Sequence, residues 1–71
     1  MFKGYKEVMR AVSENKVEEI LLARDSDVDF KNKIIEVCKS KQIKMTIVSD
    51  KKSLGKRMGL EVPCGVAGVE K

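Results

Sequence analysis

Residues 54–68 organise the chain and read Leu54-Gly55-Lys56-Arg57-Met58-Gly59-Leu60-Glu61-Val62-Pro63-Cys64-Gly65-Val66-Ala67-Gly68. The pattern predicts the end of a basic helix, an apolar loop and a strand of small residues. Gly59 stands where a helix ends in the left-handed conformation. A turn that only joins two elements is usually polar, so Leu60, Val62 and Pro63 indicate a surface that contacts a partner. The alternative is that Leu60 and Val62 fold back into the core.

The rest of the chain alternates between two kinds of apolar pattern. Three segments carry apolar residues at helical spacing and predict helices over residues 5–14, 28–41 and 51–58. Three others predict strands over residues 17–23, 43–48 and 62–69, and the first of these ends in the continuous apolar run of a central strand. Ser26 is the expected cap of the second helix, and Ser49 or Asp50 the expected cap of the third.

This alternation predicts a single domain over residues 1–71 with an α/β fold, a three-layer α/β/α sandwich around a small mixed sheet. About three strands and three helices are expected. The expected core consists of Ile20, Leu22, Ile34, Val37, Ile47, Leu54 and Val66.

Length and charge limit the function. A chain of 71 residues has room for one core and one binding face but little for a deep catalytic cleft. The net charge of +4 and the isoelectric point of about 9.2 favour an anionic partner, although lysines also occur simply as a solvated charged face. No apolar run is long enough to cross a membrane, and no signal peptide is visible.

The residue types that carry most catalysis and metal binding are scarce. There is no histidine, which removes the usual general base. Cys38 and Cys64 lack motif spacing and are expected to be free thiols, as is typical of the cytoplasm. Two cysteines without histidine make a zinc site improbable. We therefore expect no enzyme activity, no catalytic residue, no metal and no cofactor.

Four short motifs occur in order along the chain: Gly4-x-Lys6-Glu7, Leu21-Leu22-Ala23-Arg24-Asp25, Ser49-x-Lys51-Lys52-x-Leu54-Gly55 and Gly59-Leu60-Glu61-Val62-Pro63. Together they resemble the kink-turn-binding ribosomal protein family of the L-seven-Ae and L-thirty-e type, over nearly the whole chain. The resemblance implies a cytoplasmic RNA-binding protein of the ribosome or of translation. Its expected partner is a kink-turn, a bent RNA element with tandem sheared G·A pairs, in ribosomal or ribosome-associated RNA.

The resemblance also implies a division of labour among the site residues. Gly4, Lys6 and Glu7 match the helix start that reads bases, and Arg10 matches a basic position one turn later. Lys51 and Lys52 match a basic pair, and residues 60–65 match the loop that packs on bulged nucleotides. The complete predicted RNA-binding set is Gly4, Lys6, Glu7, Arg10, Lys51, Lys52, Lys56, Leu60, Glu61, Val62, Pro63 and Cys64.

Elementary chemistry supports this assignment. A-form RNA hides its base edges in a deep, narrow groove, which a sharp kink opens to a helix N-terminus. Lys6 has the donors for guanine O6 or N7, and Glu7 has acceptors for an exocyclic amino group. The alternative for Glu7 is a favourable interaction with the helix dipole, worth about 0.3–1 kcal/mol.

The chain departs from the family pattern in two places. Many family members have Asn where this chain has Lys6, and members usually carry another helix and a full strand before the position of Gly4. Either the fold tolerates the loss, or residues 1–3 pair as a short edge. An exposed sheet edge would favour self-association. The competing functional class is a protein–protein adaptor of the same fold that does not bind RNA.

Overall fold

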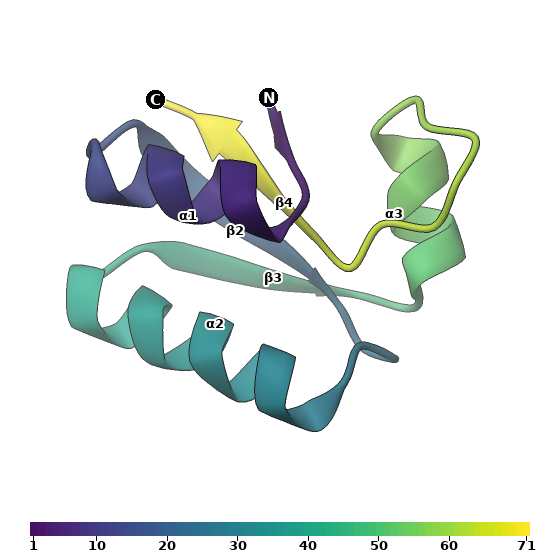
Figure 1. Ribbon diagram of the computed structural model, residues 1–71, viewed down its shortest axis with the longest axis horizontal. Coiled ribbons are helices and arrows are strands. Elements are labelled where there is room, and N and C mark those ends of the chain that lie inside the picture. The colour runs from purple at the N-terminus through teal and green to yellow at the C-terminus, as the bar shows by residue number, and fades with distance from the viewer.

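Four strands form one mixed sheet in the order β1-β4-β2-β3 (Figure 1). The computed structural model describes all of residues 1–71. The strands are β1 (Phe2–Lys3), β2 (Val17–Ala23), β3 (Lys44–Val48) and β4 (Val66–Glu70). β2 pairs parallel with β3 and antiparallel with β4, and β4 pairs antiparallel with β1. The predicted mixed sheet is confirmed, with β1 as a fourth strand beyond the three expected.

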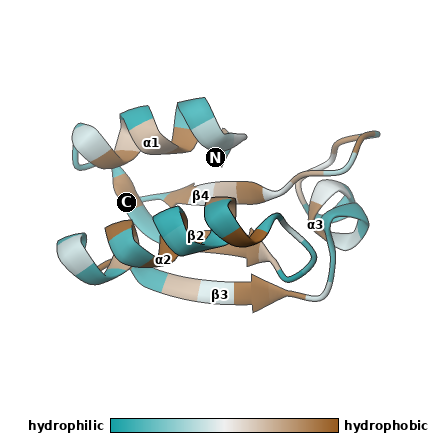
Figure 2. Ribbon diagram, turned by 60° about the horizontal axis from the view of Figure 1, so that its bottom comes forward, coloured by the Kyte–Doolittle hydropathy of each residue, from teal (hydrophilic) through white to brown (hydrophobic).

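Three helices enclose the sheet from both sides, as predicted. They are α1 (Tyr5–Ser13), α2 (Val28–Lys41) and α3 (Lys51–Arg57). In Figure 2 the helices alternate between hydrophilic and hydrophobic residues, as expected for helices with one buried face. α1 and α2 contribute Val8 and Ile34 to one core cluster, whereas α3 contributes Leu54 to a second. The fold is therefore the predicted α/β/α sandwich.

The central strand β2 supplies both clusters. Because successive side chains of a strand point to opposite faces, Ile20 and Leu22 enter the cluster under α1 and α2. Leu21 and Ala23 enter the cluster under α3. All four are buried, which explains the continuous apolar run in the sequence.

Most of the predicted core is confirmed, and one member is wrong. Ile20, Leu22, Ile34 and Leu54 are fully buried, as is Val66 at 1% exposure. Val37 packs only at the margin of its cluster. Ile47 is 47% exposed, because β3 is an edge strand with no neighbour on its outer side.

The caps show how local sequence sets the helix starts. Asp50 caps α3 by accepting a hydrogen bond from the N–H of Ser53, as predicted; that bond holds the pKa of the Asp50 carboxyl below its usual range. The prediction of Ser26 as the cap of α2 is wrong. Asp27 takes that place and accepts from the N–H groups of Asp29 and Phe30. Ser26 is buried and is bonded elsewhere.

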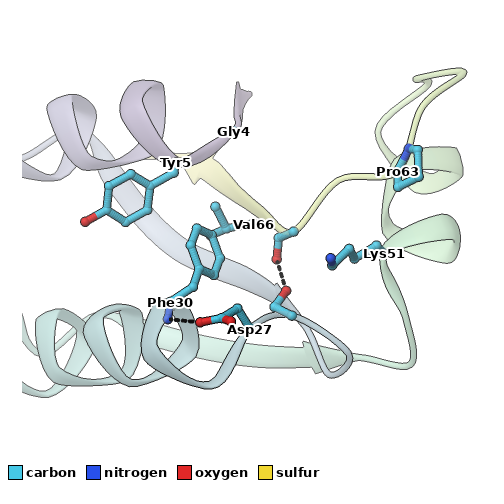
Figure 3. A pocket seen from close by; sticks show the side chains of 9 residues that line it. Gly4, Tyr5, Asp27, Phe30, Lys51, Pro63 and Val66 are labelled. Atoms are coloured by element: carbon cyan, nitrogen blue, oxygen red, sulfur yellow. Dashed lines mark hydrogen bonds between the residues drawn. The ribbon is translucent and has the colours of Figure 1, made fainter.

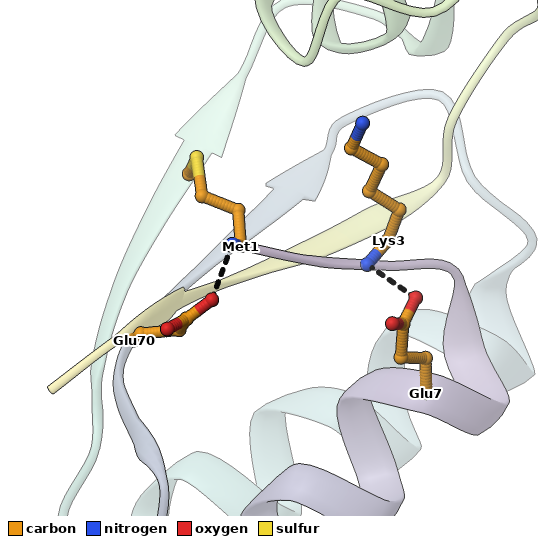
Figure 4. Close-up of polar contacts among 4 residues, drawn as sticks. All are labelled: Met1, Lys3, Glu7 and Glu70. Atoms are coloured by element: carbon orange, nitrogen blue, oxygen red, sulfur yellow. Dashed lines mark hydrogen bonds and ion pairs between the residues drawn. The ribbon is translucent and has the colours of Figure 1, made fainter.

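The N-terminal residues pair as the short edge that was one of the two expectations. Phe2 lies opposite Gly68 and Lys3 opposite Ala67. Figure 4 shows that the amino group of Met1 forms an ion pair with Glu70 at the end of β4. The edge of β4 is therefore covered over two residues.

None of the three helices has the length and apolar character that a membrane span requires.

The start of the last strand differs from the prediction. Pairing begins at Val66 instead of Val62. The reason is that the preceding loop is bonded to α3: the N–H of Cys64 donates to the Lys51 carbonyl, and the N–H of Leu60 to the Gly55 carbonyl. These residues are consequently presented as a loop at the end of the sheet.

Candidate nucleic-acid interface

Four segments far apart in the sequence meet at one end of the sheet. They are residues 4–10, 24–27, 51–56 and 60–65, and we call them the four-segment site. They surround a cavity of about 450 Å³ between the starts of α1, α2 and α3 (Figure 3). The cavity is lined by Gly4, Tyr5, Ser26, Asp27, Phe30, Lys51, Pro63, Gly65 and Val66. The parallel strands β2 and β3 both end here, which is where α/β sheets commonly bind ligands.

The start of α1 presents backbone to this end of the sheet. Gly4 has φ of +89°, a conformation that L side chains rarely adopt, and its N–H donates to the Val66 carbonyl. No side chain caps α1, and the first N–H groups of a helix have no partner inside it. The helix start is therefore polar and positive in character.

Glu7 has a structural contact that the sequence did not specify. One of its carboxylate oxygens, Oε2, accepts a hydrogen bond of 3.0 Å from the backbone N–H of Lys3 (Figure 4). Glu7 therefore braces the turn from β1 into α1. The side chain stays exposed and lines a hollow with Lys6 and Arg10, so its outer face is available to a partner.

The loop after α3 divides its residues between the core and the surface. Gly59 ends α3 with φ of +74°, as predicted. Leu60 packs against the second core cluster, whereas Val62 is 62% exposed. The alternative of folding back into the core therefore holds for Leu60 and is wrong for Val62, whose contact with a partner stays a prediction. The side chain of Cys64 is buried and its thiol donates to the Val66 carbonyl, so this thiol is not presented at the surface.

The basic residues of the site carry no neutralising partner. Lys52 and Lys56 line a groove beside Leu60, Glu61, Val62 and Pro63, and Lys51 lines the cavity. The only ion pairs in the chain are Met1–Glu70 and Lys16–Glu14. The positive charge at this end is therefore free for an anionic ligand.

Sequence reasoning missed the aromatic wall of the cavity. Tyr5 and Phe30 lie in the helices predicted over residues 5–14 and 28–41, and neither belongs to the predicted RNA-binding set. In the fold the centroids of their rings lie 5.2 Å apart, and the ring planes are inclined at 48°. Both rings border the cavity, as does Asp27. No local signal reveals this pair, because it depends on how the starts of α1 and α2 meet.

The chain matches one protein family over its whole length. The profile of the ribosomal protein L7Ae/L30e/S12e/Gadd45 family aligns with residues 1–71. An RNA-binding protein of a Geobacillus species is 35% identical over 66 residues, which cover 93% of this chain and 78% of that relative. An RNA-binding protein of Caldanaerobacter subterraneus subsp. tengcongensis is 33% identical over 64 residues, or 90% of this chain and 78% of that relative.

Solved structures share the fold. A Bacillus halodurans protein of unknown function superposes with a TM-score of 0.90 at 28% identity, covering 99% of this chain and 70% of that one. The 15.5kD RNA binding protein of Giardia lamblia gives a TM-score of 0.87 at 26% identity, covering 97% of this chain and 58% of that one. Both values confirm the architecture predicted from the sequence.

Proposed function

The chain belongs to the ribosomal protein L7Ae/L30e/S12e/Gadd45 family, and on that premise we propose that it binds RNA through the four-segment site. We propose further that its ligand is a kink-turn in ribosomal or ribosome-associated RNA, and that it acts in translation as a cytoplasmic ribosomal protein or paralogue. The observation that carries the proposal is the meeting of an uncapped helix start, unpaired cations and an aromatic-walled cavity at one end of the sheet.

The helix start suits an opened groove. Side chains do not reach base edges in regular A-form RNA, but non-Watson–Crick pairs at a kink expose them. Gly4 lets the backbone approach closely. Lys6 then donates to guanine O6 or N7, and the free face of Glu7 accepts from an exocyclic amino group. Because a carboxylate repels phosphate, Glu7 has its place beside bases.

The cavity suits a base that has left the stack. Sequence-specific RNA recognition commonly holds unstacked bases against aromatic side chains. Tyr5 and Phe30 supply an apolar wall, while Asp27 and Lys51 supply an acceptor and a donor. Val62 and Pro63 extend the apolar surface outward. A kinked RNA with bulged nucleotides offers such bases, whereas a straight duplex does not.

The test is a competition titration of the wild-type protein against a kink-turn RNA and a duplex of matched length, at one fixed salt concentration. We expect a clear preference for the kinked RNA. Equal affinities for the two RNAs would reject kink-turn recognition. Absence of binding to either would favour a protein–protein adaptor, which uses the exposed loop to bind another protein.

The cations predict the salt dependence. Neutralising any of Lys51, Lys52, Lys56 or Arg10 should lower the slope of log K against log salt by about 0.7–0.9 and should weaken kinked and straight RNA alike. Lys39→Gln, at the opposite end of α2, removes the same charge far from the site and serves as the control. Unchanged slopes in all four variants, measured by fluorescence anisotropy over a salt series, would contradict the assignment.

Specificity depends on Glu7 and Val62 in different ways. Glu7→Ala should reduce the preference for kinked RNA by roughly fivefold or more, because a base contact is worth about 1 kcal/mol at least, and should leave duplex binding intact. Val62→Ala should weaken kinked RNA through lost apolar contact, with little change in salt slope. Glu7→Gln is the matched control because its amide oxygen still accepts from Lys3. Glu7→Gln exchanges the outer acceptor oxygen for an amide nitrogen that donates, so it should lose the preference too. If Glu7→Gln kept the preference that Glu7→Ala lost, Glu7 would only brace the turn.

A further inference from the structure

The turn between β2 and α2, residues 24–27, lies at the centre of the four-segment site. None of its residues belongs to the predicted RNA-binding set. Asp25 Oδ1 accepts a hydrogen bond of 2.8 Å from the backbone N–H of Lys51, across 26 residues of sequence. Ser26 Oγ donates to the Gly65 carbonyl at 3.3 Å. One turn therefore bonds to the start of α3 and to the end of the 60–65 loop.

Backbone bonds close this connection into a ring. The Gly65 carbonyl also accepts from the N–H of Ala23 at 2.9 Å, and the Lys51 carbonyl accepts from the N–H of Cys64 at 3.0 Å. Lys51 is thus held on its N–H side by Asp25 and on its carbonyl side by the loop. Any shift of the turn would move the start of α3 and the loop together.

The charge of Asp25 makes direct contact with an RNA phosphate unfavourable. It is exposed and lies beside the lysines of α3, where a carboxylate weakens attraction of phosphate. It forms no ion pair, since the chain has only Met1–Glu70 and Lys16–Glu14. Its role in the fold is to accept a hydrogen bond from the N–H of Lys51, which, at the start of α3, has no partner within the helix.

Ser26 is the buried residue of the turn and holds the end of the 60–65 loop. It is 7% exposed, and a buried hydroxyl without a partner is costly. Its partner Gly65 lies close to it: an added Cβ would lie 3.3 Å from Ser26 Oγ, which is a tight contact, and 3.5 Å from the Phe30 ring, which is an ordinary one. The loop end is therefore seated directly on the turn.

We infer that Asp25 and Ser26 are positioning residues that set the specificity of the site, by fixing the start of α3 and the 60–65 loop against the cavity. This inference rests on the proposed RNA-binding function. Asp25 acts through Lys51 and the loop, and touches no base or phosphate itself.

The experiment separates the charge of Asp25 from its acceptor. Asp25→Ala removes both, whereas Asp25→Asn removes only the charge. Asp29→Ala is the control, because it removes a nearby carboxylate that forms no hydrogen bond with α3 or the loop. We expect Asp25→Ala to lose about two- to tenfold of the kinked-over-duplex preference, the range for one hydrogen bond. Asp25→Asn and Asp29→Ala should keep it. Ser26→Ala should resemble Asp25→Ala, and equal losses in the Ala and Asn variants of Asp25 would overturn the inference.

A second readout works without RNA. Amide hydrogen exchange of Lys51 and Cys64 in the free protein should be slow in the wild type and in Asp25→Asn, and faster in Asp25→Ala. Unchanged exchange in Asp25→Ala would refute the positioning role even if the wild type showed no RNA preference. Faster exchange in Asp25→Ala, together with a wild type that binds kinked and straight RNA equally, would reject the proposed function but support the ring of contacts.

Discussion

Gly55→Ala is expected to displace the 60–65 loop and to remove most of the preference for kinked RNA. Gly55 is buried in α3 directly beneath the loop. A Cβ at this position would lie 2.2 Å from the Val62 carbonyl oxygen and 3.2 Å from its carbon. Both atoms belong to the backbone, so no side-chain rotation relieves the overlap, and the loop itself has to move.

The stability of the variant should change less than its binding. Overpacking costs about 1–3 kcal/mol, whereas alanine is better than glycine in a helix interior by about 0.8–1 kcal/mol. Helix α3 should therefore persist while Val62 and Pro63 lose their place beside Lys52 and Lys56. The measurements are the competition titration and the amide shifts of Leu60 and Cys64.

Gly59→Asn is the matched control. A Cβ at Gly59 meets nothing within 4 Å, and asparagine tolerates the left-handed conformation better than other residues. The control should fold and should keep the RNA preference. If Gly55→Ala also kept its preference and its loop shifts, close packing of the loop on α3 would not determine specificity.

Leu22→Ala is expected to cost about 2–5 kcal/mol of folding free energy. Leu22 is fully buried on the central strand, between Val66 of β4 and Ile47 of β3. Total stability is roughly 0.05–0.15 kcal/mol per residue, or about 4–11 kcal/mol for a chain of this length. The variant should therefore be largely or partly unfolded at 37 °C, as measured by urea unfolding followed by circular dichroism.

Ile47→Ala provides the comparison within the same register pair. Ile47 lies opposite Leu22 but is 47% exposed on the edge strand. Ile47→Ala should lose much less folding free energy than Leu22→Ala. The Ile47 side chain buries less apolar area, and its truncation leaves no enclosed cavity. Equal losses for the two variants would mean that β3 is covered in solution, as by self-association through its edge.

Sequence predicted the parts of the site better than their assembly. Each of its four motifs has residues at the same end of the sheet, and Lys6, Arg10, Lys52 and Lys56 are exposed at the surface. What the motifs did not contain is the pairing of Tyr5 with Phe30 and the bonds from Asp25 and Ser26 to α3 and the loop. These contacts join residues that local patterns treat separately.

The sequence alone determined the features that depend on neighbours within a few residues. α2 has its predicted bounds, Asp50 caps α3, and Gly59 ends it in the left-handed conformation, because periodicity, caps and turns are local interactions. Tertiary structure alone decided that β3 is an edge strand, which exposes Ile47, and that the loop bonds to α3, which delays β4 to Val66. Strand order and loop seating depend on distant residues meeting, and a pattern that reads only adjacent positions carries no information about which partner a strand or loop will find.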